Sequence, residues 1–508
     1  MYIFAAPCYI GNSSTKQRFY LGKNAASVSY TRKSWIGTKP KVKNGRVKFK
    51  EGGMDVSASS LIKPMLLHTY TMINRGEGVF LYDEDGKQYL DASSGAITAN
   101  IGHGVDEIKQ AIMKQLDKVA FVYRSQFTNE PAEQLAKKID EMTSQGLKYS
   151  FFVNSGSEAT ETALKIAVQY WQERGEPRKT KIISRWMSYH GITMGALSMS
   201  GHTARRDRFV SLLESFPSIS PPYCYRCPFN KSYPSCNLMC AEELQSMIRK
   251  IGKENIAAFI CEPVIGAAGG AIPSPDGYLQ RIKQICEQND ILFISDEVMT
   301  GIGRTGAMLA CEHWDIEPDI VALGKGMSGG YTPIAATLVS EKVMEPIING
   351  SGSIMSGHTF SANPLSCAAA LAVITHIEKN NIVQHVEQKG ILLQMELAKL
   401  QMKYPFIGDV RGKGLLLGLE FVQNTVTKQP FDRDLELCNT IIQMAHNYGL
   451  LLYPAQAGID GVLGDAVLCA PPLTITFSEI HELIARLEKT MQACRDYLHE
   501  KGVLGGLE

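Results

Sequence analysis

The sequence lacks any apolar run close to the roughly 20 residues that a membrane-spanning helix needs, so we expect no membrane-embedded segment. It also lacks an excess of charge of either sign, because 52 Lys and Arg residues face 51 Asp and Glu residues. A nucleic-acid-binding surface would require a basic excess, and we therefore expect no nucleic-acid partner. The composition, 44% hydrophobic and 20% charged, is typical of a folded globular protein, and 508 residues suffice for a large domain and a smaller one.

Acidic residues are missing from the first 50 positions, which carry eleven Lys and Arg residues. A basic leader of this kind is typical of a mitochondrial transit peptide, which would place the protein in the mitochondrion. Alternatively, translation begins at Met54, since residues 50–53 can be encoded by a purine-rich run that resembles a bacterial ribosome-binding site. The leader shows no Arg-rich amphipathic helix, so we favour the second interpretation and a cytoplasmic protein. In either case residues 1–53 should not pack in the core.

Closely spaced cysteines, which would indicate disulfides or a metal site, are absent from most of the chain. Most of the 12 cysteines lie singly inside apolar runs, which is typical of buried free thiols. One cluster differs, with a spacing that could bind zinc. The alternative is a surface insertion with reduced thiols or a local disulfide. No further signal supports a metal, so we predict none and leave the question open for this cluster. Its members are Cys224, Cys227, Cys236 and Cys240.

From about Val79 the chain shows the pattern of a folded α/β protein. An Asp-Gly turn at residues 83–86 lies between two apolar runs and predicts a hairpin. Later, short apolar runs alternate with amphipathic helical stretches, which predicts a largely parallel sheet with helices on both faces. The expected strands are residues 150–153, 181–184, 256–261, 291–295 and 320–323.

From about Ala368 the helices become longer and strands are fewer, such as residues 414–421. This change indicates a smaller α+β domain at the C-terminus. We therefore expect a leader, an N-terminal segment, a large ligand-binding domain and a small domain. Their predicted bounds are 1–53, 54–110, 111–370 and 371–508.

Ligands of such sheets lie at the carboxyl ends of the strands, and two of these ends carry residues that suit a phosphate and a planar ring. After the first expected strand, residues 150–153, come Ser155, Gly156 and Ser157, at a helix start whose free N–H groups and dipole favour a phosphate. The alternative is that Ser155 only caps the helix. After the second run comes Tyr189, whose ring either stacks on a planar ligand or simply packs.

Two further strand ends carry an acid and a lysine. Asp296 directly follows a buried strand, where a protonated ring nitrogen, a helix cap or a structural ion pair could satisfy its charge. Lys325 lies between two glycines, where burial can lower its pKa and make it nucleophilic, unless it is a solvated loop lysine. A phosphate cradle, a stacking ring, an acid and such a lysine are the parts that pyridoxal phosphate requires. We therefore predict this cofactor, held by Lys325 as a Schiff base.

The motifs at and beyond these strand ends closely resemble those of the class III aminotransferases. The resemblance extends over roughly residues 66–487 and implies an α/β enzyme of pyridoxal-phosphate fold type I, with a large, mainly parallel, seven-stranded sheet. It also implies a homodimer with two active sites at the subunit interface. The matching segments are residues 154–159, 189–191, 262–264, 296–306, 323–326, 357–360 and 410–415.

The resemblance implies roles for individual residues around the cofactor. Lys325 would form the Schiff base, and Asp296 would pair with the pyridinium nitrogen. Val298 would pack under the ring, on the side opposite Tyr189. Glu262 would form a hydrogen bond near the cofactor.

The same resemblance implies contacts to the phosphate and to the substrate. Gly156 and Ser157, next to Ser155, would hold the phosphate. Thr359 would reach the phosphate of the neighbouring subunit's cofactor. Arg411 matches the arginine expected to bind a substrate carboxylate.

Three departures from the family's motifs bear on the substrate. Members that use α-ketoglutarate often carry Arg two residues after the histidine of the Tyr-His-Gly motif, where this chain has Ile192. Ornithine-type members carry Glu and Gln at the positions of Ala267 and Met299. The pattern is therefore closer to ω- or β-amino-acid aminotransferases that use pyruvate, and the cysteine cluster is not general to the family.

We predict an aminotransferase whose partners are a small-molecule amino donor and a keto acid acceptor, with ping-pong kinetics. Within the family, an α-ketoglutarate-dependent ornithine or 4-aminobutyrate aminotransferase is an alternative. A related aminomutase or decarboxylase is another, although the loop 326–330 differs from that of the aminomutases. A catalytically silent binding or scaffold protein is a third, against which the intact Lys325 and Asp296 argue.

Overall fold

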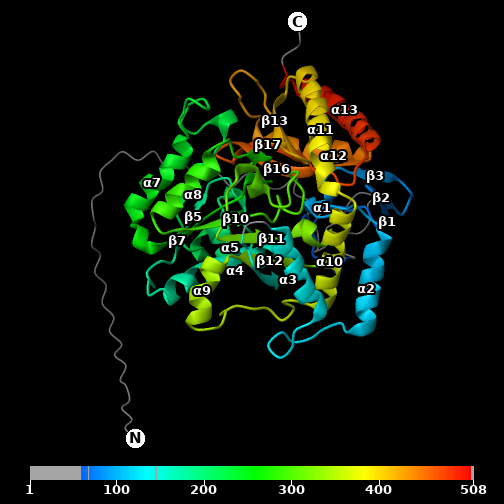
Figure 1. Ribbon diagram of the computed structural model, residues 1–508. Helices are drawn as coiled ribbons and strands as arrows, with labels where there is room; N and C mark the ends of the chain where they lie inside the picture. Colours follow the sequence, from blue (N-terminus) through cyan, green and yellow to red (C-terminus); the bar gives the residue numbers. More distant parts are fainter. Residues whose placement is uncertain (1–58, 67, 144–145, 505–508) are drawn as a thin grey trace, which may run out of the picture. The chain divides into compact units, whose positions relative to one another are not determined.

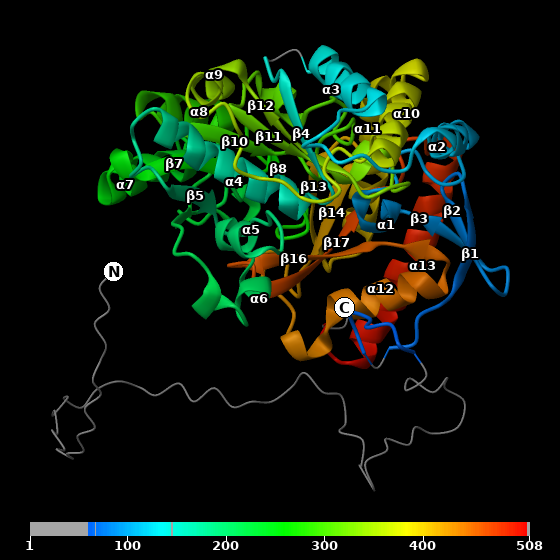
Figure 2. The same cartoon turned by 90° about the horizontal axis from the view of Figure 1, so that it is seen from below.

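The computed structural model describes residues 59–66, 68–143 and 146–504 of the chain (Figures 1 and 2). The predicted leader, residues 1–53, lies outside the described residues. The described residues from Met72 onwards form one compact unit, distinct from the residues before Met72, and this unit contains every strand and helix discussed below. Within the described ranges, no helix is long and apolar enough to cross a membrane.

A seven-stranded sheet is the main feature of this unit, with the strand order β4-β12-β11-β10-β7-β5-β6. Every pair is parallel except those of β12, which runs antiparallel to β11 and β4. The predicted seven-stranded α/β architecture is thus confirmed, although β12 and β6 had not been predicted. The strands are β4 (Tyr149–Val153), β5 (Lys181–Arg185), β6 (Ser218–Ile219), β7 (Ile256–Cys261), β10 (Leu292–Asp296), β11 (Ile320–Leu323) and β12 (Ala335–Val339).

Both faces of this sheet are covered by helices, which explains why its strands are continuously apolar. All residues of β7 are buried, and alternate residues contribute to opposite faces. Phe259 packs in one core with helices α7 and α8, and Ile260 packs in the other with α4 and α9. The helices are α4 (Gly156–Glu173), α7 (Met239–Ile251), α8 (Tyr278–Gln288) and α9 (Glu341–Asn349) (Figure 1).

The N-terminal part of the unit forms a hairpin that is joined by a strand from the C-terminal part. The predicted Asp-Gly hairpin is confirmed, since β2 and β3 pair antiparallel and Asp83 accepts hydrogen bonds from the backbone of Asp85 and Lys87. The short strand β15 pairs parallel with β3. This sheet consists of β1 (Ile73–Glu77), β2 (Phe80–Asp83), β3 (Gln88–Asp91) and β15 (Leu450–Leu451).

The C-terminal residues form a second four-stranded sheet with long helices packed on it, as an α+β region should. Its order is β13-β14-β17-β16, and the expected strand 414–421 corresponds to β14. The domain bounds predicted from the sequence stay predictions. The strands are β13 (Ile407–Lys413), β14 (Leu416–Phe421), β16 (Tyr453–Ile459) and β17 (Leu463–Cys469). The helices of this region are α11 (Ile382–Lys403), α12 (Leu437–Asn447) and α13 (Phe477–Glu500). The preceding helix, α10 (Pro364–Lys379), packs instead mainly against two helices of the N-terminal third.

Smaller elements complete the unit. Helices α1 (Ser94–Ile97), α2 (Asp106–Lys118) and α3 (Glu130–Met142) lie in its N-terminal third. Two short helices follow β5, namely α5 (Met194–Met199) and α6 (Thr203–Arg206). A two-stranded sheet, β8 (Val264–Ile265) and β9 (Ile272–Pro273), follows β7.

A fully buried arginine joins three regions that are distant in sequence. Arg304 donates through Nη1 to the carbonyl oxygens of Leu415 (3.0 Å) and Pro471 (2.6 Å). Through Nη2 it donates to Ser94 Oγ (3.2 Å) and Asn100 Oδ1 (2.7 Å). Its charge is therefore held by neutral oxygens of the N-terminal and C-terminal regions, which links both to the loop after β10.

Replacing this arginine should destabilise the whole unit. In Arg304→Met, several buried acceptors lose their donor, and each unsatisfied group costs about 1–3 kcal/mol. We expect a melting temperature several degrees lower, measured by circular dichroism on the full chain. The exposed Arg249, on α7, provides a matched control as Arg249→Met. Equal melting temperatures of the two variants would contradict the linking role.

Candidate active site

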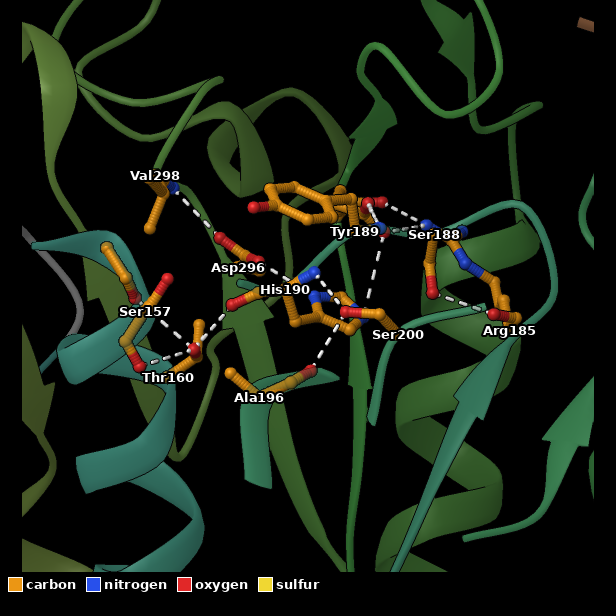
Figure 3. Close-up of polar contacts among 12 residues, drawn as sticks. Ser157, Thr160, Arg185, Ser188, Tyr189, His190, Ala196, Ser200, Asp296 and Val298 are labelled. Carbon is orange, nitrogen blue, oxygen red and sulfur yellow. Dashed lines mark hydrogen bonds and ion pairs between the residues drawn. The ribbon is translucent and has the colours of Figure 1, made fainter. Parts of the chain in front are cut away.

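The carboxyl ends of β4, β11, β10, β7 and β5 bring most of the predicted site residues to one edge of the large sheet, where only the antiparallel β12 separates β4 from the other four. Asp296 ends β10, and Glu262 directly follows β7. Tyr189 and Val298 follow β5 and β10, and Lys325 follows β11. Ser155, Gly156 and Ser157 connect β4 to α4. Figure 3 shows the part of this edge around Asp296.

The start of α4 forms a cradle without side-chain obstruction. Gly156 is the first helical residue, and a Cβ atom there would lie 2.6 Å from Val298 Cγ1, so no larger residue fits. Ser157 Oγ accepts a hydrogen bond from the backbone N–H of Ile192 (3.0 Å), which leaves its own hydroxyl hydrogen for another acceptor. Ser155 caps the helix by accepting from Glu158 N (3.2 Å). The uncovered N–H groups of the first turn therefore suit an anion.

The Asp296 carboxylate is held by two hydrogen bonds and is 3% exposed. Oδ1 accepts from Val298 N (3.0 Å), and Oδ2 lies 2.7 Å from His190 Nδ1 (Figure 3). Burial by itself lowers the pKa of His190, but Glu262 and Asp296 raise it above its usual value, because both stabilise the charged ring. The contact with His190 therefore fixes the position of the Asp296 carboxylate inside the sheet edge.

The sequence placed His190 in the Tyr-His-Gly motif, directly after Tyr189, but no role had been assigned to it. Its backbone is fixed on both sides: His190 N donates to Ser200 Oγ (2.8 Å), and Thr160 Oγ1 donates to the His190 carbonyl (2.5 Å) (Figure 3). The Tyr-His-Gly motif was the available signal, but the Asp296 contact joins residues 106 positions apart. Only the fold reveals this partner.

Glu262 organises the loop that carries Tyr189. Its Oε1 accepts from Tyr189 N (2.9 Å), and its Oε2 accepts from the fully buried Arg185 (3.1 Å). The Tyr189 ring is partly buried, and burial raises the pKa of its hydroxyl. Glu262 therefore fixes the backbone of Tyr189, and its expected role near the cofactor stays a prediction.

Lys325 follows Gly324 in a strained turn with a φ of 43°, a value that non-glycine residues rarely adopt. Burial lowers the pKa of its amine to about 8, and Arg205 and Arg304 act in the same direction, whereas Asp296 opposes the shift. A substantial fraction of the amine is therefore neutral near physiological pH. Such an amine can act as a nucleophile and as a base.

Two predicted residues lie apart from this group. Thr359 is exposed on the segment before α10. Arg411, on β13, is 8% exposed, and its Nη1 pairs with Asp409 (2.6 Å) and Glu420 (2.7 Å). Its Nη2 donates to the carbonyl oxygen of Gly269 (2.7 Å). Its charge is thus paired within the chain in this structure, and its role toward a substrate carboxylate stays a prediction.

The cysteine-bearing insertion, residues 220–240, packs beside this neutralised arginine. Tyr223 donates to Glu420 Oε2, and Arg226 Nε donates to Glu420 Oε1 (2.7 Å). All four cysteines of the cluster are free thiols that line one small cavity. Within the described residues, however, no three His, Cys, Asp or Glu side chains form a group that could hold a metal ion. The insertion also forms a wall of a pocket of about 1120 Å³ next to Trp186 and Met187.

Comparison with known proteins identifies the family. The chain matches the family described as "Aminotransferase class-III" over residues 63–491. It belongs to the class III aminotransferases. It is 50% identical to the aminotransferase YodT of Bacillus subtilis, a match that covers 86% of this chain and 98% of that protein. It is 34% identical to the putrescine–pyruvate aminotransferase of Pseudomonas aeruginosa, over 83% of this chain and 90% of that one.

A solved structure agrees with the same assignment. An amine transaminase from an uncultivated Pseudomonas species, in its PLP-bound form, superimposes with a TM-score of 0.82 and 34% identity. The match covers 87% of this chain and 100% of the transaminase. The class III aminotransferase fold and its cofactor, pyridoxal phosphate (PLP), are therefore confirmed.

The residues present fit PLP. The start of α4 offers N–H groups and the Ser157 hydroxyl to a phosphate, and Gly156 leaves space beside Val298. Asp296 offers a buried carboxylate to a ring nitrogen, and Lys325 offers an amine with a lowered pKa.

The lowered pKa of Lys325 predicts how the cofactor binds. When protein freed of PLP is mixed with PLP, covalent attachment requires the neutral amine, so its rate should rise with pH and level off above about pH 8. An ordinary lysine would continue to react faster up to about pH 10. Stopped-flow absorbance measures the rate, and peptide mapping after borohydride reduction locates the label. Attachment to another lysine, or unchanged attachment in Lys325→Arg, would refute the role.

Proposed function

We propose that this aminotransferase moves an amino group from an ω- or β-amino acid, or a related amine, to pyruvate by a ping-pong mechanism. The observation that carries the choice of acceptor is the side chain at Ile192. Ile192 is a half-exposed apolar side chain where α-ketoglutarate users often carry Arg, so Arg411 is left as the one arginine that the family's motifs assign to a carboxylate. A second carboxylate on the acceptor would therefore lose its solvation without gaining a cationic partner. Pyruvate has one carboxylate and a methyl group.

The residues of the site have separate tasks in this reaction. PLP, when bound, forms a covalent bond to the amine and accepts the electrons of the broken Cα–H bond. The neutral Lys325 amine removes the proton from Cα as a base and later returns a proton as an acid. Asp296, fixed by His190 and the N–H of Val298, presents its carboxylate to the ring nitrogen. Tyr189 and Val298 restrict the ring from opposite sides.

The phosphate and the second subunit complete the proposal. Ser155, Gly156 and Ser157 hold the phosphate at the start of α4, and the exposed Thr359 is suited to reach the site of a partner subunit in a homodimer. We place this reaction in the cytoplasm. The putrescine–pyruvate aminotransferase among the relatives supports both a terminal amine donor and pyruvate. An aminomutase, a decarboxylase or a silent scaffold would not move an amino group between two separate substrates.

Asp296→Asn should leave the fold intact and lose most turnover. A charge-assisted hydrogen bond of this kind stabilises the bound state by about 1.5–3 kcal/mol, so PLP should bind more weakly. Turnover at saturating PLP should fall about 100-fold or more, because charge develops on the ring during proton removal. Asp315→Asn, at an exposed position, provides the control. Turnover near that of the control would exclude the assignment of Asp296.

The choice of acceptor can be tested directly. With one good donor, kcat/KM should be severalfold higher for pyruvate than for α-ketoglutarate. Ile192→Arg should raise kcat/KM for α-ketoglutarate and change kcat/KM for pyruvate less. Ile192→Leu should leave kcat/KM unchanged for both keto acids. An unmodified enzyme that prefers α-ketoglutarate severalfold would show that the argument from two carboxylates is wrong for this site. A protein that moves no amino group to any keto acid would refute the proposed function altogether.

A further inference from the structure

We propose that Cys224 and Cys227 are a redox-sensitive pair of thiols, and that a disulfide between them weakens the binding of substrate carboxylates. The pair is a modification site on the insertion, residues 220–240, and its effect on substrates rests on the proposed function. Both cysteines are free thiols. Within the described residues, no three His, Cys, Asp or Glu side chains could hold a metal ion that would occupy them.

The backbone places the two thiols on one side of a tight turn. A short 3₁₀ helix spans Cys224–Arg226, and Cys227 directly follows it. Residues three positions apart lie on the same side of such a helix, and in a turn of this kind their Cα atoms lie within about 7 Å. A disulfide joins Cα atoms up to about 7 Å apart, so a small change of the turn suffices to form the bond.

Access from solvent distinguishes this pair from the other two cysteines of the cluster. Cys224 is exposed and Cys227 is partly exposed, and both line the pocket of about 1120 Å³ beside Trp186. Cys236 and Cys240 line the smaller cavity and not that pocket. A small oxidant that enters the large pocket therefore meets Cys224 and Cys227.

The oxidant that the pair requires is a small disulfide. One cysteine thiolate attacks a sulfur of this molecule, forms a mixed disulfide and releases the first small thiol. The other cysteine thiolate attacks the protein sulfur of the mixed disulfide, closes the bond between Cys224 and Cys227 and releases the second small thiol. Two cysteine thiols are oxidised, and the small disulfide is reduced to two thiols that carry the two protons.

The surroundings of Cys224 favour a slow and lasting response. Its side chain is partly shielded from water, which raises the pKa of its thiol, and the nearby Cys227 and Cys236 act in the same direction. Because only the thiolate attacks, the bond forms slowly. A thiol with a raised pKa is also a poor leaving group, so the disulfide reopens slowly.

The turn that carries the pair also holds the buried acid Glu420. Tyr223 donates to Glu420 Oε2, and Arg226 donates through Nε to Glu420 Oε1 (2.7 Å). Tyr223 directly precedes the pair, and Arg226 lies between the two cysteines. Pro222 and Pro228 flank this stretch, and because a proline fixes its own φ, the neighbouring chain absorbs little of a change in the turn. Closure of the disulfide should therefore displace the two side chains that hold Glu420.

Displacement of these donors changes the interaction between Glu420 and Arg411. Glu420 is fully buried and pairs with Arg411 Nη1 (2.7 Å). A buried carboxylate that loses two donors depends more strongly on the cation that remains. Release of Arg411 toward a substrate carboxylate then costs more free energy. Substrates with a carboxylate should therefore bind more weakly to the oxidised enzyme, and plain amines should be affected less.

The first measurement locates the disulfide in the holoenzyme of the full chain. The protein is incubated with hydroxyethyl disulfide, which carries neither an amine nor a carboxylate, and the remaining thiols are alkylated and mapped by mass spectrometry. Cys224 and Cys227 should be joined by a bond that dithiothreitol breaks, and Cys224→Ser and Cys227→Ser should each lack it. Cys236→Ser, in the same cluster, is the matched control and should still form the bond. No reaction, a mixed disulfide that never closes, or bonds between other cysteines only would overturn the assignment of the pair.

A binding measurement tests the effect on the site. Propionate carries a carboxylate without an amine, and its dissociation constant can be measured from the change in cofactor absorbance without turnover. Oxidation should raise this constant by about threefold or more, as expected for the loss of one or two hydrogen bonds, and reduction should restore it. The double variant Cys224→Ser, Cys227→Ser should not respond. Equal propionate affinity of the oxidised and reduced enzyme, or no propionate binding by either, would overturn the coupling to Glu420.

Transamination separates this inference from the proposed function. With pyruvate as acceptor, oxidation should lower kcat/KM for β-alanine by about threefold or more, mainly through KM, and change kcat/KM for propylamine less. An equal loss for both donors would show that the disulfide does not act through the carboxylate. Failure of the reduced enzyme to use any ω- or β-amino acid would instead refute the proposed function, and the propionate measurement would still decide the role of the thiol pair.

Discussion

The whole site depends on one buried carboxylate, that of Asp296, at the C-terminal end of a strand in the large sheet. Asp296 is almost fully buried, and a buried charge is stable only when opposite charges or donors surround it. The protein supplies them as a chain of alternating groups from Arg185 through Glu262 and His190 to Asp296. Because this chain crosses from β5 to β10, the same contacts that stabilise the acid also fix the neighbouring strand ends.

The Tyr189 loop shows how one set of interactions serves several purposes. Glu262 holds its backbone, His190 joins it to Asp296, and Ser188 and Ser200 connect it to the segment that leads into α6. The stacking ring, the acid and the short helix are thereby positioned together. An error in any of these contacts would displace all three, so the site is organised before a substrate arrives.

The sequence predicted the parts of the site that depend on local pattern. Asp296 directly follows a short apolar run, and Lys325 follows another after one glycine, so both strand ends could be recognised without knowing the neighbouring strands. The strand β12 escaped prediction because it lies between β4 and β11, two strands that are far apart in the chain. Its pairing is a property of the sheet and not of its own five residues.

Properties of the site that depend on contacts between distant elements could not be predicted from the sequence. Whether Arg411 is open or neutralised depends on Glu420, which lies on the adjacent strand β14 and is itself held by the insertion. A motif indicates which residue types are present, but not which charges remain unpaired after folding.

The contacts of the cysteine-bearing insertion with Glu420 have a consequence for the C-terminal sheet. Tyr223 and Arg226 supply two of the groups that satisfy this buried acid, and Glu420 in turn pairs with Arg411. Removal of the insertion would leave this carboxylate short of partners on β14, between its neighbours β13 and β17. A stretch of chain at the surface therefore contributes to the stability of a strand inside the sheet.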